Sequence, residues 1–281
     1  MIKSILLAVD GSVYTDSVLH YGIEFAKVLN AHLRVLTVID VRVYEWVINS
    51  GGEGYMPVMP ANVYLDESQK FLVQRADILL EKAQKKLSAA AADVSFEMIK
   101  EEGSPVEVIC SHARQVDLLI MGSRGDYARW GDNLLGATLE SVSRQCQTPL
   151  MVINKEVSHP QKIIVAYDRS ESSTHALKFS AYLAQSINLP VDVYTIHDNE
   201  QIRHEILDEA KTYLEPYKLM YNLHHEAGDA AEIIIRATHD SPEPALLTMG
   251  SYGHSRIREA IIGSTTVQVM RKAKKPILLA K

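Results

Sequence analysis

The chain has 281 residues and a formal net charge of −6, with 47% hydrophobic and 23% charged residues, a composition typical of a soluble globular protein with about two domains. Residues 1–155 carry 15 Lys and Arg against 19 Asp and Glu, and residues 156–281 carry 14 against 16, so neither half has the basic surplus of a nucleic-acid-binding protein. No apolar run approaches the ~20 residues that span a bilayer, and we therefore expect a cytoplasmic protein without a nucleic-acid or membrane partner.

The first half alternates short apolar strands with helices. Strands are predicted at residues 5–9, 32–39, 94–99, 117–121 and 149–153, and helices at 16–29 (with Ser12 as N-cap), 68–92, 105–114 and 137–146. The opening apolar residues are interrupted by Asp10 and are followed by no small-residue cleavage motif, so they indicate a first strand and not a signal peptide. Alternating strands and helices imply a parallel sheet with right-handed crossovers.

The second half repeats this order. A strand that ends before Asp168 is followed by predicted strands at 191–196, 223–227, 245–249 and 276–280, with helices at 201–215 and 230–238 and a last helix that opens near Gly263. Two further blocks recur in order: DLLIMGSRG (117–125) matches ALLTMGSYG (245–253), and TPLMVINK (148–155) matches KPILLAK (275–281). Such repetition predicts a duplicated domain, with units at residues 1–156 and 160–281.

The first unit carries an insertion. Asp10 and Asp168 are 158 positions apart, whereas Gly122 and Gly250 are 128 apart, which leaves 30 additional residues at about 41–71. This stretch is rich in Gly and Pro and contains Tyr44, Trp46, Tyr55 and Tyr64. A lid, a partner-contacting loop and a tolerated surface insertion are all compatible with it.

The expected fold class is α/β, with two doubly wound five-stranded parallel sheets in tandem. Ligands bind such sheets beyond the carboxyl ends of the strands. At this edge, Gly250-Ser-Tyr-Gly253 leaves a strand, and after nine intervening residues Gly263-Ser264-Thr265 opens a helix. Glycine permits close backbone approach and a helix N-terminus offers free N–H groups, so the segment predicts a phosphate cradle. A tight turn followed by an ordinary N-cap is the alternative.

This strand-Gly-x2-Gly-x9-Gly-Ser pattern, together with a first strand that ends in VAYD, resembles the nucleotide-binding universal stress proteins, and the resemblance extends over both halves. It implies the universal stress fold and an ATP or AMP ligand, with Mg or Mn. It places Asp168 on the ribose and metal side and the backbone around Ile196 against adenine. The nucleotide-binding residues that it implies are Ala166, Tyr167, Asp168, Ile196, Met249, Gly250, Gly253, His254, Gly263, Ser264 and Thr265. It further implies that the last strands of the two halves pair into an intramolecular pseudo-dimer, with a homodimer as a further option.

The first half departs from this pattern. Ten residues separate Gly125 from Gly136, and Ala137 stands where Ser is expected, although Thr138 follows. One inserted residue moves backbone donors by up to ~3.5 Å, unless a bulge at Trp130-Gly131 absorbs it. We therefore expect the better-matched site in the second half. A degenerate site is expected at Asp10, Val38, Gly122, Gly125, Gly136 and Thr138, where Arg124 or Arg129 could supply charge.

The remaining polar residues suggest no catalytic centre. Cys110 and Cys146 are too few for a disulfide framework, and both are expected as thiols, Cys110 as a small buried apolar side chain. No histidine pair has the spacing of a zinc site, and there is no Walker lysine or recognisable nucleophile–base pair. The expected function is a regulatory ATP- or AMP-binding module in stress response, with slow ATP hydrolysis at most. The alternative is a non-nucleotide interaction or small-ligand scaffold.

Overall fold

The computed structural model describes residues 2–42, 61–90, 93–125, 135–251 and 263–281, with residues 61–66 and 68 described by their backbone alone. The first half contains β1 (Ser4–Ala8), α1 (Thr15–Leu29), β2 (His32–Asp40), α3 (Ala61–Ala90), β3 (Phe96–Gly103), α4 (Pro105–Ala113), β4 (Leu118–Gly122), α5 (Ala137–Gln145) and β5 (Leu150–Ile153). The second half contains β6 (Lys162–Ala166), α6 (Glu171–Ile187), β7 (Val191–Ile196), α7 (Glu200–Leu214), the short 3-10 helix η1 (Glu215–Tyr217), β8 (Tyr221–Glu226), α8 (Ala230–Asp240), β9 (Ala245–Gly250), α9 (Ser264–Lys272) and β10 (Ile277–Ala280).

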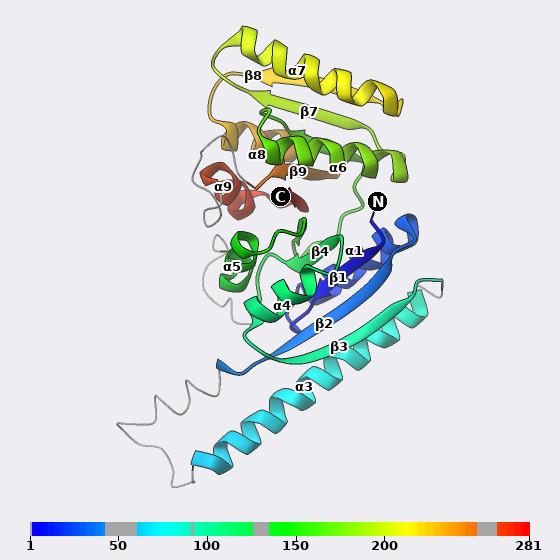
Figure 1. The fold of residues 1–281 in the computed structure, drawn as a ribbon, viewed down its shortest axis with the longest axis vertical. Helices are drawn as coiled ribbons and strands as arrows, with labels where there is room; N and C mark the ends of the chain where they lie inside the picture. The colour runs from blue at the N-terminus through cyan, green and yellow to red at the C-terminus, as the bar shows by residue number, and fades with distance from the viewer. Residues whose placement is uncertain (1, 43–60, 91–92, 126–134, 252–262) are drawn as a thin grey trace.

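The described strands form one ten-stranded sheet in the order β3-β2-β1-β4-β5-β10-β9-β6-β7-β8 (Figure 1). Each half is a parallel, doubly wound sheet, because β1 lies between β2 and β4 and β6 lies between β7 and β9. This confirms the predicted fold class. The antiparallel pairing of β5 with β10 joins the two sheets, with Met151 opposite Leu278. The pairing of the last strands within the chain is therefore confirmed as well.

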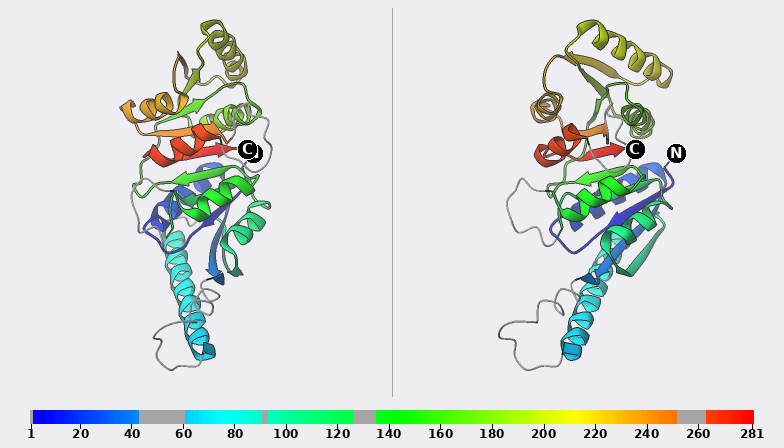
Figure 2. Two further views of the ribbon diagram at one scale, coloured as in Figure 1. Left: turned by 90° about the vertical axis from the view of Figure 1, so that its left-hand side faces the viewer. Right: turned by 60° about the vertical axis from the view of Figure 1, so that its left-hand side comes forward.

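Helices cover both faces of the sheet (Figure 2), and the side chains of β1 alternate between them. Ile5 and Leu7 belong to a core layer with residues of α1, α3, α6 and α7, whereas Leu6 belongs to a layer with residues of α4, α5, α8 and α9. Each layer contains buried residues of both halves, so the two repeats share their hydrophobic core. Among the described helices, none combines the length and apolar character needed to cross a membrane.

Two predicted helix starts differ from the structure. Tyr14, and not Ser12, is the N-cap of α1, because Gly11 has a left-handed backbone with φ of +80° and inserts a turn before the helix. Ser12 Oγ instead accepts a hydrogen bond of 3.3 Å from the Tyr14 N–H. The helix α3 begins at Ala61, before the predicted start at residue 68, so residues 61–71 of the predicted insertion are helical. Residues 43–60 of that insertion lie outside the described residues.

Side-chain contacts reinforce the junction between the halves. Ser17 Oγ donates a hydrogen bond of 2.6 Å to the carbonyl of Lys155, and Tyr21 Oη donates to the carbonyl of Ser158. Lys281, which follows β10, donates from Nζ to the carbonyl of Ser143 in α5, and burial lowers its pKa to about 8. The segment after β5 is thus held against α1, and the end of β10 against the first half.

The two cysteines form a disulfide, which corrects the prediction that both are thiols. Cys110 in α4 and Cys146 at the C-cap of α5 have Cα atoms 5.3 Å apart and are bonded through their sulfur atoms. They are 7% and 3% exposed, so the bond lies inside the core layer of α4 and α5. The bond could not be predicted because the two residues are 36 positions apart and follow no local pattern.

Protein denatured without reductant is expected to contain no free thiol and to contain both thiols after reduction, as a thiol-reactive dye would measure. Because the bond closes a loop of 36 residues, its reduction should lower the free energy of unfolding by roughly 2–5 kcal/mol. A Cys110→Ser, Cys146→Ser variant should resemble the reduced protein and should not respond to reductant. Two reactive thiols in protein purified and denatured without reductant would contradict the bond.

Candidate functional site

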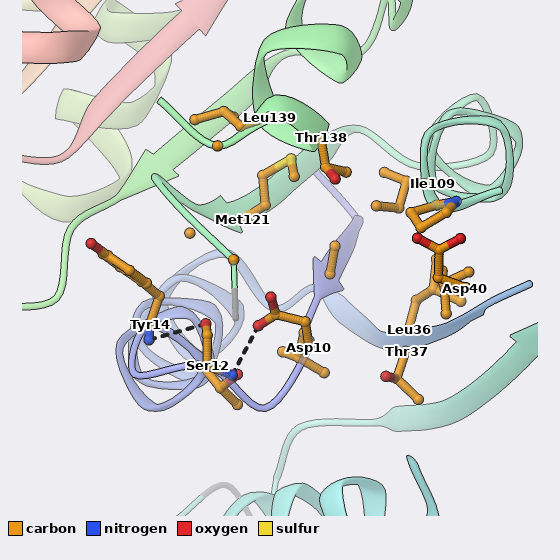
Figure 3. A pocket seen from close by; sticks show the side chains of 18 of the residues that line it. Asp10, Ser12, Tyr14, Leu36, Thr37, Asp40, Ile109, Met121, Thr138 and Leu139 are labelled. Carbon is orange, nitrogen blue, oxygen red and sulfur yellow. Dashed lines mark hydrogen bonds between the residues drawn. The ribbon is translucent and has the colours of Figure 1, made fainter. Parts of the chain in front are cut away.

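A cavity of about 530 Å³ lies at the carboxyl ends of β1, β2 and β4 in the first half (Figure 3). In the strand order of this half, β1 and β4 are neighbours at the point where the order reverses, which is where doubly wound sheets bind ligands. Its polar or glycine lining includes Asp10, Ser12, Thr37, Asp40, Arg42, Arg75, Gly122, Arg124, Gly125, Gly136 and Thr138. Its apolar lining includes Val38, Leu72, Ala76, Leu79, Ile109, Met121 and Leu139.

The loop after β1 fixes Asp10 at the edge of this cavity. Asp10 Oδ1 accepts a hydrogen bond of 3.0 Å from the Ser12 N–H, drawn in Figure 3. The N–H of Gly11, whose backbone is left-handed, donates to Thr15 Oγ1 at 3.1 Å. A methyl group at Gly125 would lie 2.7 Å from Asp10 Oδ2, so the glycine lets the loop after β4 approach this carboxylate.

The two described ends of the glycine loop after β4 meet at the N-terminus of α5. The Gly136 N–H donates to the Ser123 carbonyl at 3.1 Å, and the Ser123 N–H donates to the Ile153 carbonyl at 2.8 Å. Gly136 is the N-cap of α5, and the first intrahelical bond runs from Glu140 N–H to the Gly136 carbonyl. The preceding N–H groups of the first turn have no intrahelical acceptor. Because residues 137–139 line the cavity, this turn presents backbone donors and the positive end of the helix dipole to it.

The second half holds the ends of its glycine loop in the same way. The Gly263 N–H donates to the Ser251 carbonyl at 3.2 Å, and the Ser251 N–H donates to the Ala280 carbonyl at 3.0 Å. Asp168 Oδ1 also accepts from the Ser170 N–H at 3.0 Å. The additional residue of the first loop therefore leaves both anchoring bonds unchanged, and its ends are not displaced. Residues 126–134, with the predicted bulge at Trp130-Gly131, lie outside the described residues.

The segment at the end of β2 forms the wall opposite the glycine loop. Val38 and Asp40 line the cavity there. Arg42 donates from Nε and Nη2 to the two carboxylate oxygens of Asp40 at 2.8 and 2.7 Å, and this hydrogen bonding raises the pKa of Arg42. The pair holds the chain where it leaves β2.

One wall of the cavity, formed by α3, was not predicted from the sequence. Leu72, Arg75, Ala76 and Leu79 of α3 line the cavity; they lie in the helix predicted at 68–92, just after the predicted insertion. An ideal Cβ atom at Gly11 would lie 3.6 Å from Arg75 Nη2, so α3 brings a guanidinium against the loop after β1. The helix itself is predicted from its periodicity, but no local sequence signal indicates that it packs against the cavity.

The structure brings the six first-half residues of the predicted degenerate site around this one cavity: Asp10, Val38, Gly122, Gly125, Gly136 and Thr138. Most of the second-half residues lie at the equivalent edge: Ala166 and Asp168 at β6, Ile196 at the end of β7, Met249 and Gly250 at the end of β9, and Gly263, Ser264 and Thr265 at the start of α9. Gly253 and His254 lie outside the described residues. The side chain of Tyr167 is buried in the core layer of α6 and α7, and burial raises its pKa, so only its backbone can face a ligand.

Comparison with known proteins agrees with this architecture. The family model described as the universal stress protein family matches residues 1–154 and again residues 160–281. The curated universal stress protein Slr1230 of Synechocystis sp. is 30% identical over 285 residues, a match that covers 98% of this chain and 99% of that protein.

Solved structures show the same fold. A universal stress protein from Archaeoglobus fulgidus has a TM-score of 0.78 at 23% identity, with 99% of this chain and 98% of that chain covered. A putative universal stress protein from Pseudomonas aeruginosa has a TM-score of 0.66 at 16% identity, with 100% and 93% covered. The chain therefore belongs to the universal stress protein family and carries two of its domains in tandem.

Proposed function

We propose that this universal stress protein is an ATP- or AMP-binding regulatory module, and that the first-half cavity is its principal site. The observation that carries the proposal is the convergence of the Asp10 loop, the glycine loop and the N-terminus of α5 on one cavity. Its volume of about 530 Å³ falls within the ~300–1,000 Å³ of small-molecule sites. A Ser at position 137 is not needed, since backbone N–H groups supply the donors.

Each part of the cavity suits one part of a nucleotide. The N–H groups of the first turn of α5 and the glycine loop would hold the phosphates, with Arg124 adding positive charge. Asp10 would face the ribose and a nucleotide-bound Mg or Mn ion. The backbone at Val38 would meet the base, and the apolar side chains of Ile109 and Met121 offer it flat contacts. The bound ion would neutralise phosphate charge, and the residues of the chain would orient the nucleotide.

The second half offers a second phosphate cradle, at Gly250, Gly253, Gly263, Ser264 and Thr265. Its support is the residue spacing and the anchoring bonds that it shares with the first half. The described residues that line the first-half cavity include no histidine, cysteine or lysine, and we propose a role in binding and signalling, with at most slow hydrolysis. A stress-related regulatory role follows from the family and is part of the proposal.

The proposal is tested by counting nucleotide. Freshly purified protein is denatured, the released nucleotide is identified by chromatography and mass, and stripped protein is titrated calorimetrically with ATP in the presence of Mg. We expect adenine nucleotide at about one equivalent per chain, and loss of most of the affinity in Asp10→Ala. Val13→Ala, an exposed change in the same loop, is the control and should bind normally. Absence of binding by either route would overturn the nucleotide function in favour of a scaffold for other ligands.

A further inference from the structure

The helix α7 of the second half occupies the place that α3 has in the first. In the first half, Lys100 of β3 donates to Asp77 of α3 at 2.5 Å. In the second half, His225 of β8 packs against His204 of α7 with ring centroids 4.7 Å apart. Positions 77 and 204 therefore correspond. Two further buried positions support this register: Ala83 and Leu87 of α3 are identical to Ala210 and Leu214 of α7, at the same offset as Asp77 and His204.

This correspondence places Arg203 where the first half has Ala76. Ala76 is 6% exposed and lines the first-half cavity with only a methyl group. Arg203 is 9% exposed, so a long cationic side chain is buried at the equivalent point of the second half. Arginine is seldom buried unless its donors are satisfied.

The guanidinium of Arg203 is bonded to the chain where it leaves β7. Nη1 donates to the carbonyls of His197 at 2.6 Å and Asp198 at 3.1 Å, and Nε donates to Nδ1 of His225 at 3.2 Å. His197 and Asp198 correspond to Ile39 and Asp40, which line the first-half cavity. They directly follow Ile196, the position expected to meet the base.

We propose that Arg203 fills the base-binding end of the second-half site, so that the chain binds nucleotide in its first half alone. The inference rests on the proposed function and makes Arg203 the residue that determines which half is occupied. The side chain takes up the space that Ala76 leaves open and engages the carbonyls that a base would approach. The described ends of the second-half glycine loop then keep their anchoring bonds, although the site holds no whole nucleotide.

The test is a reciprocal exchange, measured by calorimetric titration with ATP and Mg. Wild-type protein should bind about one equivalent per chain, whereas Arg203→Ala should bind about two, with the additional equivalent lost on adding Gly263→Val. Arg203→Met removes the charge but keeps the bulk, and should still bind one. Ala76→Arg should abolish binding to the first half, while Ile78→Arg, the same change at an exposed position of α3 outside the cavity lining, should preserve it. Circular dichroism would verify that each variant is folded.

The outcomes separate the two proposals. Binding of one equivalent by both the wild type and Arg203→Ala would overturn the role of Arg203 and leave the nucleotide function intact. Two equivalents in the wild type, or weaker binding in Arg203→Ala, would also overturn it, the latter because Arg203 would then be a ligand contact. No binding in any protein would refute the nucleotide function itself, and the role of Arg203 with it.

Discussion

Replacement of Gly136 by valine is expected to weaken binding of ATP and Mg by roughly 100-fold, which corresponds to about 2.7 kcal/mol. A Cβ atom at this position would lie 3.1 Å from Arg124 Cα and 3.5 Å from both the Gly125 nitrogen and the Ser123 carbonyl oxygen. The two further methyl groups of valine would force the glycine loop away from the N-terminus of α5, and the phosphate donors would lose their arrangement. Calorimetric titration of the folded variant would measure the loss.

The matched control is Gly263→Val, because Gly263 is the N-cap of α9 and donates the same anchoring bond in the second half. It should leave the affinity of the first half within about twofold. The opposite pattern, with full binding in Gly136→Val and lost binding in Gly263→Val, would place the principal site in the second half. That result would support the prediction from residue spacing that the second half holds the better-matched site.

Replacement of Leu278 by aspartate is expected to lower the free energy of unfolding by more than about 4 kcal/mol, because it buries a carboxylate without a partner. Leu278 is 0% exposed, lies opposite Met151 across the β5–β10 pairing and belongs to a core layer that contains residues of both halves. The destabilisation should therefore reach both domains. Denaturant unfolding would give the free energy, and hydrogen exchange would show protection lost in β1 and β6 alike.

An aspartate at Val28 provides the comparison, since this side chain of α1 is 51% exposed. Its effect on stability should stay within about 0.5 kcal/mol. If Leu278→Asp unfolds the second half and leaves protection of β1 at its wild-type level, the two halves are independent folding units and the shared core contributes little to their coupling.

The fold was predictable because its signals are local and occur twice. The strand at 118–121 is apolar on both faces, as strands covered by helices must be, and the recurrence of this block at 246–249, with Thr248 as its one polar residue, revealed the duplication. The first residue of α1 was harder to predict from the sequence. The left-handed backbone of Gly11 and the hydrogen bond from its N–H to Thr15 Oγ1 determine where the helix begins. Neither effect appears in hydrophobic periodicity.

The residues of the candidate site were predictable only where a local sequence motif marks them. Asp10, Gly125 and Gly136 stand at strand ends and a helix start, so the fold class suffices to bring them together. The contribution of Ala76 and the proposed obstruction by Arg203 depend on the register between two helices that have few residues in common. That register became visible through tertiary contacts such as Lys100 with Asp77. The proposed ranking of the two halves therefore rests on the packed structure, and the bond between Cys110 and Cys146 was found only there.

The order of the strands also determines which strand edges of the described sheet stay unpaired. Because β5 and β10 pair with each other, the described sheet ends at β3 on one side and β8 on the other. An exposed strand edge invites pairing with a neighbouring molecule, and charged side chains on the edge oppose it. The outer strand β3 carries exposed Glu97, Lys100, Glu101 and Glu102, and β8 carries His224, His225 and Glu226. The charged side chains of β3 therefore oppose extension of the sheet at this edge.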